Sequence, residues 1–308
     1  MNKIVIALGG NALQEAGKPA TAQAQLEVVE RTSVYIADIL EKGYQIVLAH
    51  GNGPQVGRLV IQNEYAEPVT PAMPFDVCGA MSQGMIGYHI QQGLSKVLRS
   101  RGNSTPVATV VTQVVVDSHD PKFQNPSKPI GPFYTEEEAA AIAAQKGYVM
   151  KEDAGRGWRR VVASPMPVEI VELDAVRCLV DNGFIVVTVG GGGIPVVRNA
   201  QGNLKGVAAV IDKDLASEDL DVDALVILTA VEKVSINFKK PDQKDLDTLS
   251  VAEAKRYIAE GHFAPGSMLP KIEAAVKFVE SKPGRRAIIT SLDQAALALE
   301  GKAGTTIA

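Results

Sequence analysis

The stretch IVIALGGNAL, residues 4–13, joins an apolar run to a turn built on Gly9 and Gly10. Short runs rich in Val and Ile that stop at a turn signal are typical of buried strands. Six such runs are predicted as strands, at 3–8, 44–49, 108–116, 185–189, 224–228 and 287–290. Helical patterns lie between most of them. This alternation predicts an α/β fold with a mainly parallel sheet covered on both faces.

The helices between these strands carry start and stop signals. Apolar residues from Leu26 to Leu40 recur at helical spacing and stop at Gly43, where a residue with positive φ can end a helix. A second helix is expected after Asp76 and should end before Gly102. Two more are expected to begin at capping boxes, formed by Thr135 with Glu138 and by Ser250 with Glu253.

Residues 117–167 interrupt this alternation. They contain a proline-rich loop (HDPKFQNPSKPIGPFY, 119–134), a capped helix and a predicted hairpin (KEDAGRGWRR, 151–160) that turns at 154–157. A long insertion of this kind is either a solvated excursion or a functional element. Lys128 and the basic, glycine-rich turn favour the functional interpretation. A second hairpin is expected to turn at 199–203, and a polar surface loop is expected at 239–247.

Composition narrows the partners and the location. The chain has 308 residues, 46% of them hydrophobic, which is enough for one large core or two lobes that share a cleft. Its 31 Lys and Arg against 35 Asp and Glu give a net charge of −4, and no basic surface for nucleic acid is expected. The first apolar run breaks at Gly9, too early for a signal peptide or a membrane span. Cys78 and Cys178 are expected to be buried thiols of a reducing compartment, so a cytoplasmic location is predicted.

Three glycine-rich turns each follow a predicted strand directly. They are Gly9-Gly10-Asn11, Gly51-Asn52-Gly53 and the four glycines at 190–193. In open α/β sheets, ligands bind at the carboxyl ends of the strands, where these turns fall. Glycine allows close approach of the backbone to a phosphate, and the following helix presents unpaired N–H groups. A single turn of this kind is most simply a tight turn, but three together favour an anion-binding crevice.

Other nucleotide-binding motifs are absent or incomplete. The spacing Gly51-x-Gly53-x-x-x-Gly57 is one residue too long for the dinucleotide fingerprint. The chain contains neither a G-x-x-x-x-G-K-[ST] phosphate loop nor the His-Arg-Asp and Asp-Phe-Gly motifs of protein kinases. His50 could act as a general base, although a packed residue at a strand end is the simpler interpretation.

Three lysines stand at positions suited to neutralising phosphate charge. Lys128 lies between Ser and Pro, Lys213 between Asp212 and Asp214, and Lys271 after Met-Leu-Pro. Phosphoryl transfer depends on positioning and on neutralisation of developing charge, which lysine supplies as a compact cation. Each lysine alone could equally be a solvated surface charge. The Asp-Lys-Asp sequence could orient its lysine or reach a metal, and spacing alone does not decide. No metal site made of protein ligands is predicted.

Five segments resemble one family in order and spacing. They are IVIALGGNAL (4–13), VLAHGNGPQVG (47–57), VTVGGGGIPV (187–196), AVIDKDLAS (209–217) and GSMLPKIEA (266–274). The chain is similar over its whole length to the carbamate kinases, a branch of the amino acid kinase family. The segments HGNGPQVG (50–57) and GRGWRRVVASP (155–165) are features of that branch.

The resemblance implies a three-layer αβα sandwich within a single amino-acid-kinase-type domain, 1–308. An acceptor lobe, 1–205, would carry the protruding subdomain at about 117–167, and a nucleotide lobe would comprise 206–308. A homodimer built around the N-terminal lobe is also implied. Small molecules would be the substrates, with Mg²⁺ accompanying ATP or ADP, and neither nucleic acid nor membrane would be a partner.

The resemblance also implies roles for individual residues. Gly9, Gly10 and Asn11 would hold the transferred phosphoryl group, and Gly51, Asn52 and Gly53 would hold carbamate. Lys213 and Lys271 would neutralise the β and γ phosphates, oriented by Asp214 with help from Asp212. The residues assigned to the nucleotide base and ribose are Ala230, Val231, Val234, Met268 and Pro270.

One departure from the wider family supports the narrower resemblance. Many members carry a lysine just before the first glycine pair, where this chain has Ala7, and Lys128 of the subdomain would replace that charge. The implied reaction is ATP plus carbamate giving ADP plus carbamoyl phosphate, run towards ATP in fermentative arginine breakdown. A related acyl-phosphate-forming kinase and a non-catalytic nucleotide-binding regulator are the alternatives.

Overall fold

An eight-stranded sheet is the frame of the computed structural model, which describes residues 3–15, 17–153, 155–217, 220–265 and 267–308. The strand order is β15-β17-β16-β12-β1-β2-β9-β3. Among the described residues, all neighbouring strands of this sheet pair in parallel except β16 and β17. The strands are β1 (Lys3–Leu8), β2 (Gln45–His50), β3 (Val107–Thr109), β9 (Ile185–Val187), β12 (Ala224–Thr229), β15 (Thr248–Leu249), β16 (Arg286–Ser291) and β17 (Thr305–Ile307). The predicted α/β class with a mainly parallel sheet is confirmed.

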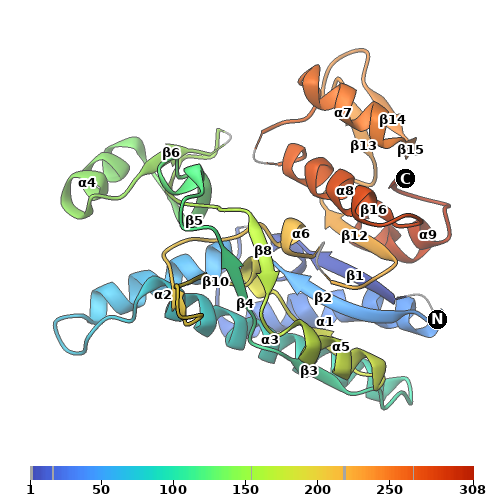
Figure 1. Cartoon of the computed structure of the whole chain (residues 1–308), viewed down its shortest axis with the longest axis horizontal. Coiled ribbons are helices and arrows are strands. Elements are labelled where there is room, and N and C mark those ends of the chain that lie inside the picture. Colours follow the sequence, from blue (N-terminus) through green and yellow to red (C-terminus); the bar gives the residue numbers. More distant parts are fainter. Residues whose placement is uncertain (1–2, 16, 154, 218–219, 266) are drawn as a thin grey trace.

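Helices cover both faces of the sheet because its central strand is apolar on both sides. Ile4 and Ile6 of β1 belong to one buried cluster, and Val5 and Ala7 belong to another. The first cluster includes residues of α1 (Ala22–Glu41), α3 (Phe75–Ser100) and α9 (Ala295–Leu299). The second includes residues of α5 (Leu173–Asp181), α6 (Lys213–Ala216), α7 (Val251–Ala259) and α8 (Leu269–Ser281). This is the expected three-layer αβα arrangement, with α1 and α3 side by side on one face (Figure 1).

The insertion projects from this layered body as a small subdomain (Figure 1, green). It holds the antiparallel strands β5 (Lys128–Tyr134), β7 (Trp158–Val162) and β6 (Met150–Glu152), together with α4 (Glu136–Lys146). Helix α2 (Gly53–Ala66) of the main body packs against β5. A Cβ on Gly57 would lie 2.2 Å from the Cα of Gly131, so α2 and β5 touch where both residues are glycine.

A second, four-stranded sheet links the subdomain to the main body. Its order is β11 (Leu204–Gly206), β10 (Ile194–Arg198), β4 (Gln113–Val116) and β8 (Pro167–Ile170). Strands β10 and β11 form the hairpin expected at 199–203. The subdomain begins after β4 and ends before β8, and these two strands pair antiparallel. Its two ends therefore lie next to each other.

Local signals placed the helix ends correctly. Helix α1 stops just before Gly43, whose φ is +87°. Helix α3 begins one residue before Asp76 and ends before Gly102. The capping boxes that open α4 and α7 are both formed. Within the described ranges, no helix combines the length and apolarity needed to cross a bilayer.

One strand prediction and one loop prediction were wrong. The run 108–116 is split into β3 in the main sheet and β4 in the second sheet. Between them the side chain of Gln83 donates to the Thr112 carbonyl over 3.1 Å and accepts from the Thr112 amide over 2.8 Å. Gln83 of α3 thus provides the hydrogen bonds that the Thr112 backbone would otherwise make to a neighbouring strand. The loop expected at 239–247 contains β14 (Lys244–Leu246), which pairs with β13 (Val234–Ile236).

The prediction for the two cysteines was half right. Cys78 is buried, whereas Cys178 is exposed. Cys178 lies on α5 midway between Val176 and Val180, which are both buried. Because two residues span about 200° around an α-helix, Cys178 faces away from the core.

Candidate active site

The three glycine-rich turns meet at the carboxyl ends of neighbouring strands. Strands β1, β2 and β9 are adjacent, and each leads towards one of the turns. The amide of Gly51 donates to the Leu8 carbonyl over 3.1 Å, which joins the second turn to the first strand. A Cβ on Gly190 would lie 2.5 Å from Nε2 of His50, so the third turn packs against the end of β2.

These turns differ in what surrounds their glycines. Gly10 opens a 3₁₀ turn (Gly10–Ala12), and a Cβ there would face open space. A Cβ on Gly191 would lie 2.2 Å from Nδ2 of Asn52, and one on Gly192 would lie 2.3 Å from the Ile211 carbonyl oxygen. The glycines at 191 and 192 are therefore required by close packing, whereas the turn at Gly10 has room for a ligand.

The second turn opens helix α2 and lies against the insertion, with Asn52 buried. Asn52 donates from Nδ2 to Oγ of Ser82 over 2.8 Å. Its Oδ1 is buried and accepts no hydrogen bond from the described residues. A Cβ on Gly53 would lie 3.2 Å from the Pro129 carbonyl oxygen, so β5 passes directly beside this turn. The side chain of Asn11, from the first turn, lies outside what the structure describes.

Asp212, Lys213 and Asp214 start helix α6, and their side chains form a buried ion-pair network. Oδ1 of Asp212 accepts the Asp214 amide over 2.9 Å and caps the helix. Nζ of Lys213 lies 2.5 Å from Oδ1 of Asp214, and Nζ of Lys271 lies 3.3 Å from Oδ2. Asp214 is 1% exposed. One buried carboxylate therefore orients ammonium groups from α6 and from the first turn of α8.

Burial and charge act against each other in this network. Burial lowers the pKa of Lys213, an effect that the Asp214 carboxylate opposes. The same carboxylate raises the pKa of Lys271. Burial alone would raise the pKa of Asp212, but the Lys128 and Lys213 ammonium groups hold that pKa well below its ordinary value. Asp212 and Lys271 are consequently charged at neutral pH.

The insertion brings a third lysine to the same place. Nζ of Lys128, the first residue of β5, lies 2.6 Å from Oδ2 of Asp212. The pair Lys128–Asp212 and the set Lys213–Asp214–Lys271 thus lie next to each other, joined by the hydrogen bond from the Asp214 amide to Asp212, and extend from the insertion through α6 to α8.

A buried arginine holds the strand that carries Lys128. Arg159 donates from Nε and Nη2 to the Gly131 carbonyl over 3.2 and 2.9 Å, and its Nη1 lies 3.2 Å from Oδ2 of Asp153. Its Nη2 would also lie 4.0 Å from a Cβ on Gly53. Arg159 was missed from the sequence, although it lies in the basic hairpin at 151–160.

His50 is packed at the end of β2. It is 1% exposed, and Nδ1 lies 3.0 Å from the Gly51 carbonyl oxygen. Burial lowers its pKa to about 4. A neutral, enclosed imidazole fits the simpler of the two interpretations of this residue.

A cavity of about 600 Å³ adjoins Lys271 on the other side of the network. Three of the five residues assigned to the nucleotide, Ala230, Val231 and Met268, line it. The cavity lining does not include Val234 or Pro270. Val234 is fully buried, and its amide donates to Oγ1 of Thr305 over 2.8 Å.

Further lining residues of this cavity were missed from the sequence. They include Lys233, Phe238, Lys240, His262 and Phe263. They come from the β13–β14 region and from the segment before α8, outside the three glycine-rich turns that the sequence pointed to.

Carboxylates at the site are few. In the described part of the chain, no three His, Cys, Asp or Glu side chains come together as a metal cluster. Asp212 and Asp214 are both engaged by lysines.

The N-terminus of α2 has no side-chain cap, so its amide groups can bind an anion. The arrangement is suited to holding two anions close together while lysines neutralise their repulsion.

Comparison with known proteins relates the whole chain to one group. The model of the amino acid kinase family matches residues 2–291. The carbamate kinase of Clostridium perfringens is 55% identical over 312 residues, covering 99% of each chain. That of Thermococcus kodakarensis is 54% identical, covering 100% of this chain and 99% of its own. A solved structure of carbamate kinase from Giardia lamblia bound to AMP-PNP has a TM-score of 0.90 and 47% identity, covering 99% of this chain and 98% of the other.

Proposed function

The chain belongs to the amino acid kinase family, and on this premise we propose that it transfers a phosphoryl group between ATP and carbamate, giving ADP and carbamoyl phosphate. Relatives at 54–55% identity over nearly their full length are carbamate kinases. The observation that carries the proposal is the two neighbouring sets of ion pairs from Lys128 to Lys271, which lie beside Gly51 at one end and reach the 600 Å³ cavity at the other.

The reaction needs charge neutralisation more than proton transfer. Carbamate is already an anion, so its oxygen can attack the γ phosphorus without a general base, as the bond from that phosphorus to the bridging oxygen of ADP breaks. A neutral, buried His50 agrees with this. We assign the open turn at Gly9, Gly10 and Asn11 to the transferred group, because a Cβ on Gly10 would meet nothing within 4 Å and leaves room for a ligand.

The lysines take separate parts in this proposal. Lys213 and Lys271, held by Asp214, neutralise the phosphates, and Lys128 approaches from the acceptor side. Gly51, Asn52 and Gly53 form the carbamate site, at the uncapped N-terminus of α2. Fixed cations in a water-poor site stabilise developing charge more effectively than the same groups do in water.

Mg²⁺ fits these residues as an ion held mainly by the nucleotide. Mg²⁺ usually takes one or two protein carboxylates together with substrate phosphates. Asp212 and Asp214 are the candidates here, and no larger acidic cluster exists among the described residues. When bound, Mg²⁺ would neutralise phosphate charge and help to align the transferred group.

We further propose a direction for the reaction, a metabolic setting and a division of the chain into two lobes. A mixed anhydride such as carbamoyl phosphate is a strong phosphoryl donor, so the proposed direction is ATP synthesis, in fermentative arginine breakdown in the cytoplasm. Residues 1–205 are assigned to the acceptor lobe and 206–308 to the nucleotide lobe.

We also propose a homodimer built on α2 and α3. Large apolar side chains are exposed along these helices and the loop between them: Ile61, Tyr65, Val69, Met73, Val77, Met81 and Tyr88. Tyr65 and Val69 are 89% and 91% exposed. Helices α2 and α3 contact each other, and large apolar side chains exposed on neighbouring elements are characteristic of a protein interface. Light scattering of Tyr65→Asp should show a monomer where the wild type shows a dimer.

The test is ATP formation from ADP and carbamoyl phosphate, with Mg²⁺ and after its chelation, and with acetyl phosphate as the control donor. Fast, Mg²⁺-dependent ATP formation from carbamoyl phosphate alone is the expected result. In the opposite direction, ADP formation from ATP with acetylglutamate or aspartate as the acceptor would indicate another acyl-phosphate-forming kinase. ADP binding without any turnover would indicate a regulator.

A further inference from the structure

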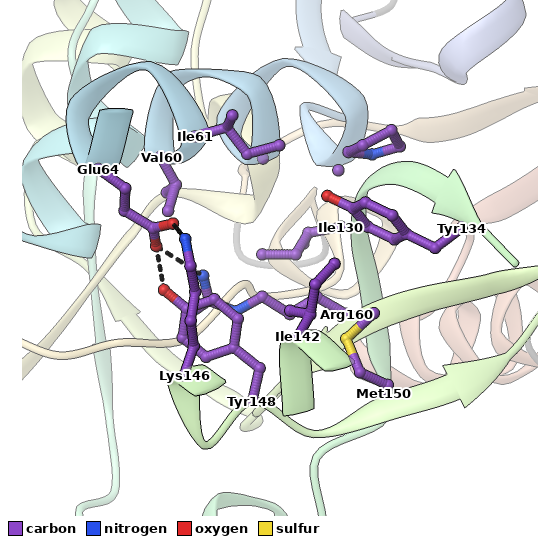
Figure 2. A pocket seen from close by; sticks show the side chains of 13 residues that line it. Val60, Ile61, Glu64, Ile130, Tyr134, Ile142, Lys146, Tyr148, Met150 and Arg160 are labelled. Atoms are coloured by element: carbon purple, nitrogen blue, oxygen red, sulfur yellow. Dashed lines mark hydrogen bonds and ion pairs between the residues drawn. The ribbon is translucent and has the colours of Figure 1, made fainter. Parts of the chain in front are cut away.

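A second cavity, of about 130 Å³, lies between helix α2 and the insertion (Figure 2). Its walls are largely apolar, with Val60 and Ile61 from α2, Ile130 from β5, Ile142 from α4 and Met150 from β6. An apolar cavity of about 150 Å³ in another protein is large enough to hold benzene. This cavity therefore has room for a body of about four or five carbon atoms.

One end of the cavity carries excess positive charge. Glu64, Lys146 and Arg160 line it, so two cations face one carboxylate. Glu64 accepts hydrogen bonds from Lys146 and from the Tyr148 hydroxyl (Figure 2). Arg160 lies 3.8 Å from Oε1 of Glu64, which is beyond hydrogen-bonding distance.

The Arg160 guanidinium is held in place by an aromatic ring. It stacks on Tyr148, with 3.5 Å between its central carbon and the ring centroid. A guanidinium carries five N–H donors, so donors remain for an anion that enters beside it. A planar carboxylate matches this fork through two parallel hydrogen bonds.

The cavity borders the strand that carries Lys128. Ile130, Gly131 and Tyr134 of β5 line it, two to six residues beyond Lys128. Pairing between β5 and β7 shifts register between Ile130 and Tyr134, and Gly131 has a φ of +71°. The strand is thus irregular beside the cavity. A molecule bound there would bridge α2 to β5 and restrict how β5 moves.

We propose that this cavity binds a small aliphatic monocarboxylate, with its apolar body between α2 and the insertion and its carboxylate on Arg160, and that this binding regulates the enzyme. Binding favours the position of β5 described here, in which Lys128 reaches Asp212. The KM for carbamoyl phosphate should fall about five-fold or more, the lower end of typical coupling between distinct sites. This regulatory part rests on the proposed function, whereas the binding site does not.

The probe is 3-methylbutanoate, which has a four-carbon body, and its neutral amide is the matched control ligand. Protein labelled with ¹³C at its methionine methyl groups is titrated in the presence of ADP and Mg²⁺, and Met150→Leu identifies the Met150 resonance. The acid should shift that resonance saturably, and the amide should bind at least ten-fold more weakly. An unmoved Met150 resonance would overturn the site. Simple competition between the acid and carbamoyl phosphate would also overturn the site, because it would place the acid in the substrate site.

Two variants act on different walls of the site. Ile142→Phe fills the apolar part and Arg160→Gln removes the charge, and each should weaken binding at least ten-fold. Arg177→Gln, exposed on α5, is the matched control and should bind normally. Thermal melts show which variants are folded, and a folded variant of either kind with wild-type affinity would refute the assignment.

The kinetic arm uses the wild type alone. Binding at Met150 with an unchanged KM would overturn the regulatory part. Absence of ATP formation would count against the proposed function and leave the binding result intact.

Discussion

Replacing Asp214 by Asn removes the charge at the centre of the ion-pair network and keeps the shape of the side chain. The lost carboxylate lies 2.5 Å from Lys213 and 3.3 Å from Lys271. At an effective dielectric constant of about 20, a pair of unit charges at the longer distance is worth about 5 kcal/mol. Removing one partner of a buried ion pair costs about 3–5 kcal/mol in measured cases. We expect the free energy of unfolding to fall by that amount at neutral pH.

The loss should depend on pH because Lys213 stays buried. Burial already lowers the pKa of Lys213, and without Asp214 that pKa falls further. Between the folded pKa and the ordinary value of 10.5, the unfolded chain binds more protons than the folded chain, so stability rises with pH. In Asp214→Asn the rise of stability with pH extends over a wider pH interval than in the wild type, because the folded pKa of Lys213 is lower. The deficit of the variant relative to the wild type should therefore shrink as the pH is raised from neutral towards 10.5.

Urea unfolding at neutral and alkaline pH measures both effects. Asp174→Asn is the matched control, because the Asp174 side chain is 97% exposed and its pairing with Arg177 should contribute less than about 1 kcal/mol. A loss below about 1 kcal/mol for Asp214→Asn, or a deficit that does not change with pH, would refute the reasoning. Turnover of Asp214→Asn should also fall by about 100-fold or more.

Four further outcomes are expected. Lys271→Ala should lower kcat by about 100- to 1,000-fold in the ATP-forming assay and leave the urea midpoint close to wild type, because Asp214 keeps Lys213 as a partner. Lys128→Ala should lower turnover while calorimetry shows unchanged ADP affinity, because Lys128 does not line the 600 Å³ cavity. Gly57→Ala should lower turnover, since its Cβ would lie 2.2 Å from the Cα of Gly131 and must displace β5. The free energy of unfolding should fall by up to about 3 kcal/mol from pH 6.5 to pH 4. The reason is that the pKa of His50 is lowered from 6.5 to about 4, so the unfolded chain takes up this proton at a higher pH than the folded chain. In urea titrations His50→Gln should flatten this dependence on pH.

Each outcome has a result that contradicts it. Near-normal turnover of Lys271→Ala or Lys128→Ala would remove that lysine from the mechanism. Gly79→Ala is the control for Gly57→Ala, because a Cβ on Gly79 meets nothing within 4 Å, and equal losses in the two would contradict the steric argument. An unchanged acid slope in His50→Gln would assign that slope to other groups.

Local sequence signals predicted the central elements well. Strands β1, β2, β12 and β16 and the ends of α1 and α3 follow from apolar periodicity, glycine and capping residues, which act over a few positions. The run 108–116 failed because its division depends on Gln83, which lies far away in sequence and bonds to Thr112. Periodicity within a segment cannot reveal a partner outside it.

Some residues of the candidate site could also be predicted from local sequence, and others could not. Lys213 and Lys271 stood out because polar residues interrupt apolar patterns there, and the structure brings both to Asp214. Arg159 and the residues around the 600 Å³ cavity gave no comparable signal, because packing of the insertion and of the β13–β14 region places them. The glycines at 191 and 192 were expected at an anion site, yet close contacts with Asn52 and Ile211 explain them.

The two ends of the insertion have a consequence for how such a protein can change over generations. Val116 and Pro167 are paired across β4 and β8, so the segment between them leaves and re-enters the fold at one point. A single deletion in the gene, bridged by a few codons for a tight turn, would convert β4 and β8 into a plain hairpin. The layered body would keep its strand order while losing Lys128. If Lys128 acts in phosphoryl transfer as proposed, one genetic event would turn an active enzyme into an inactive one.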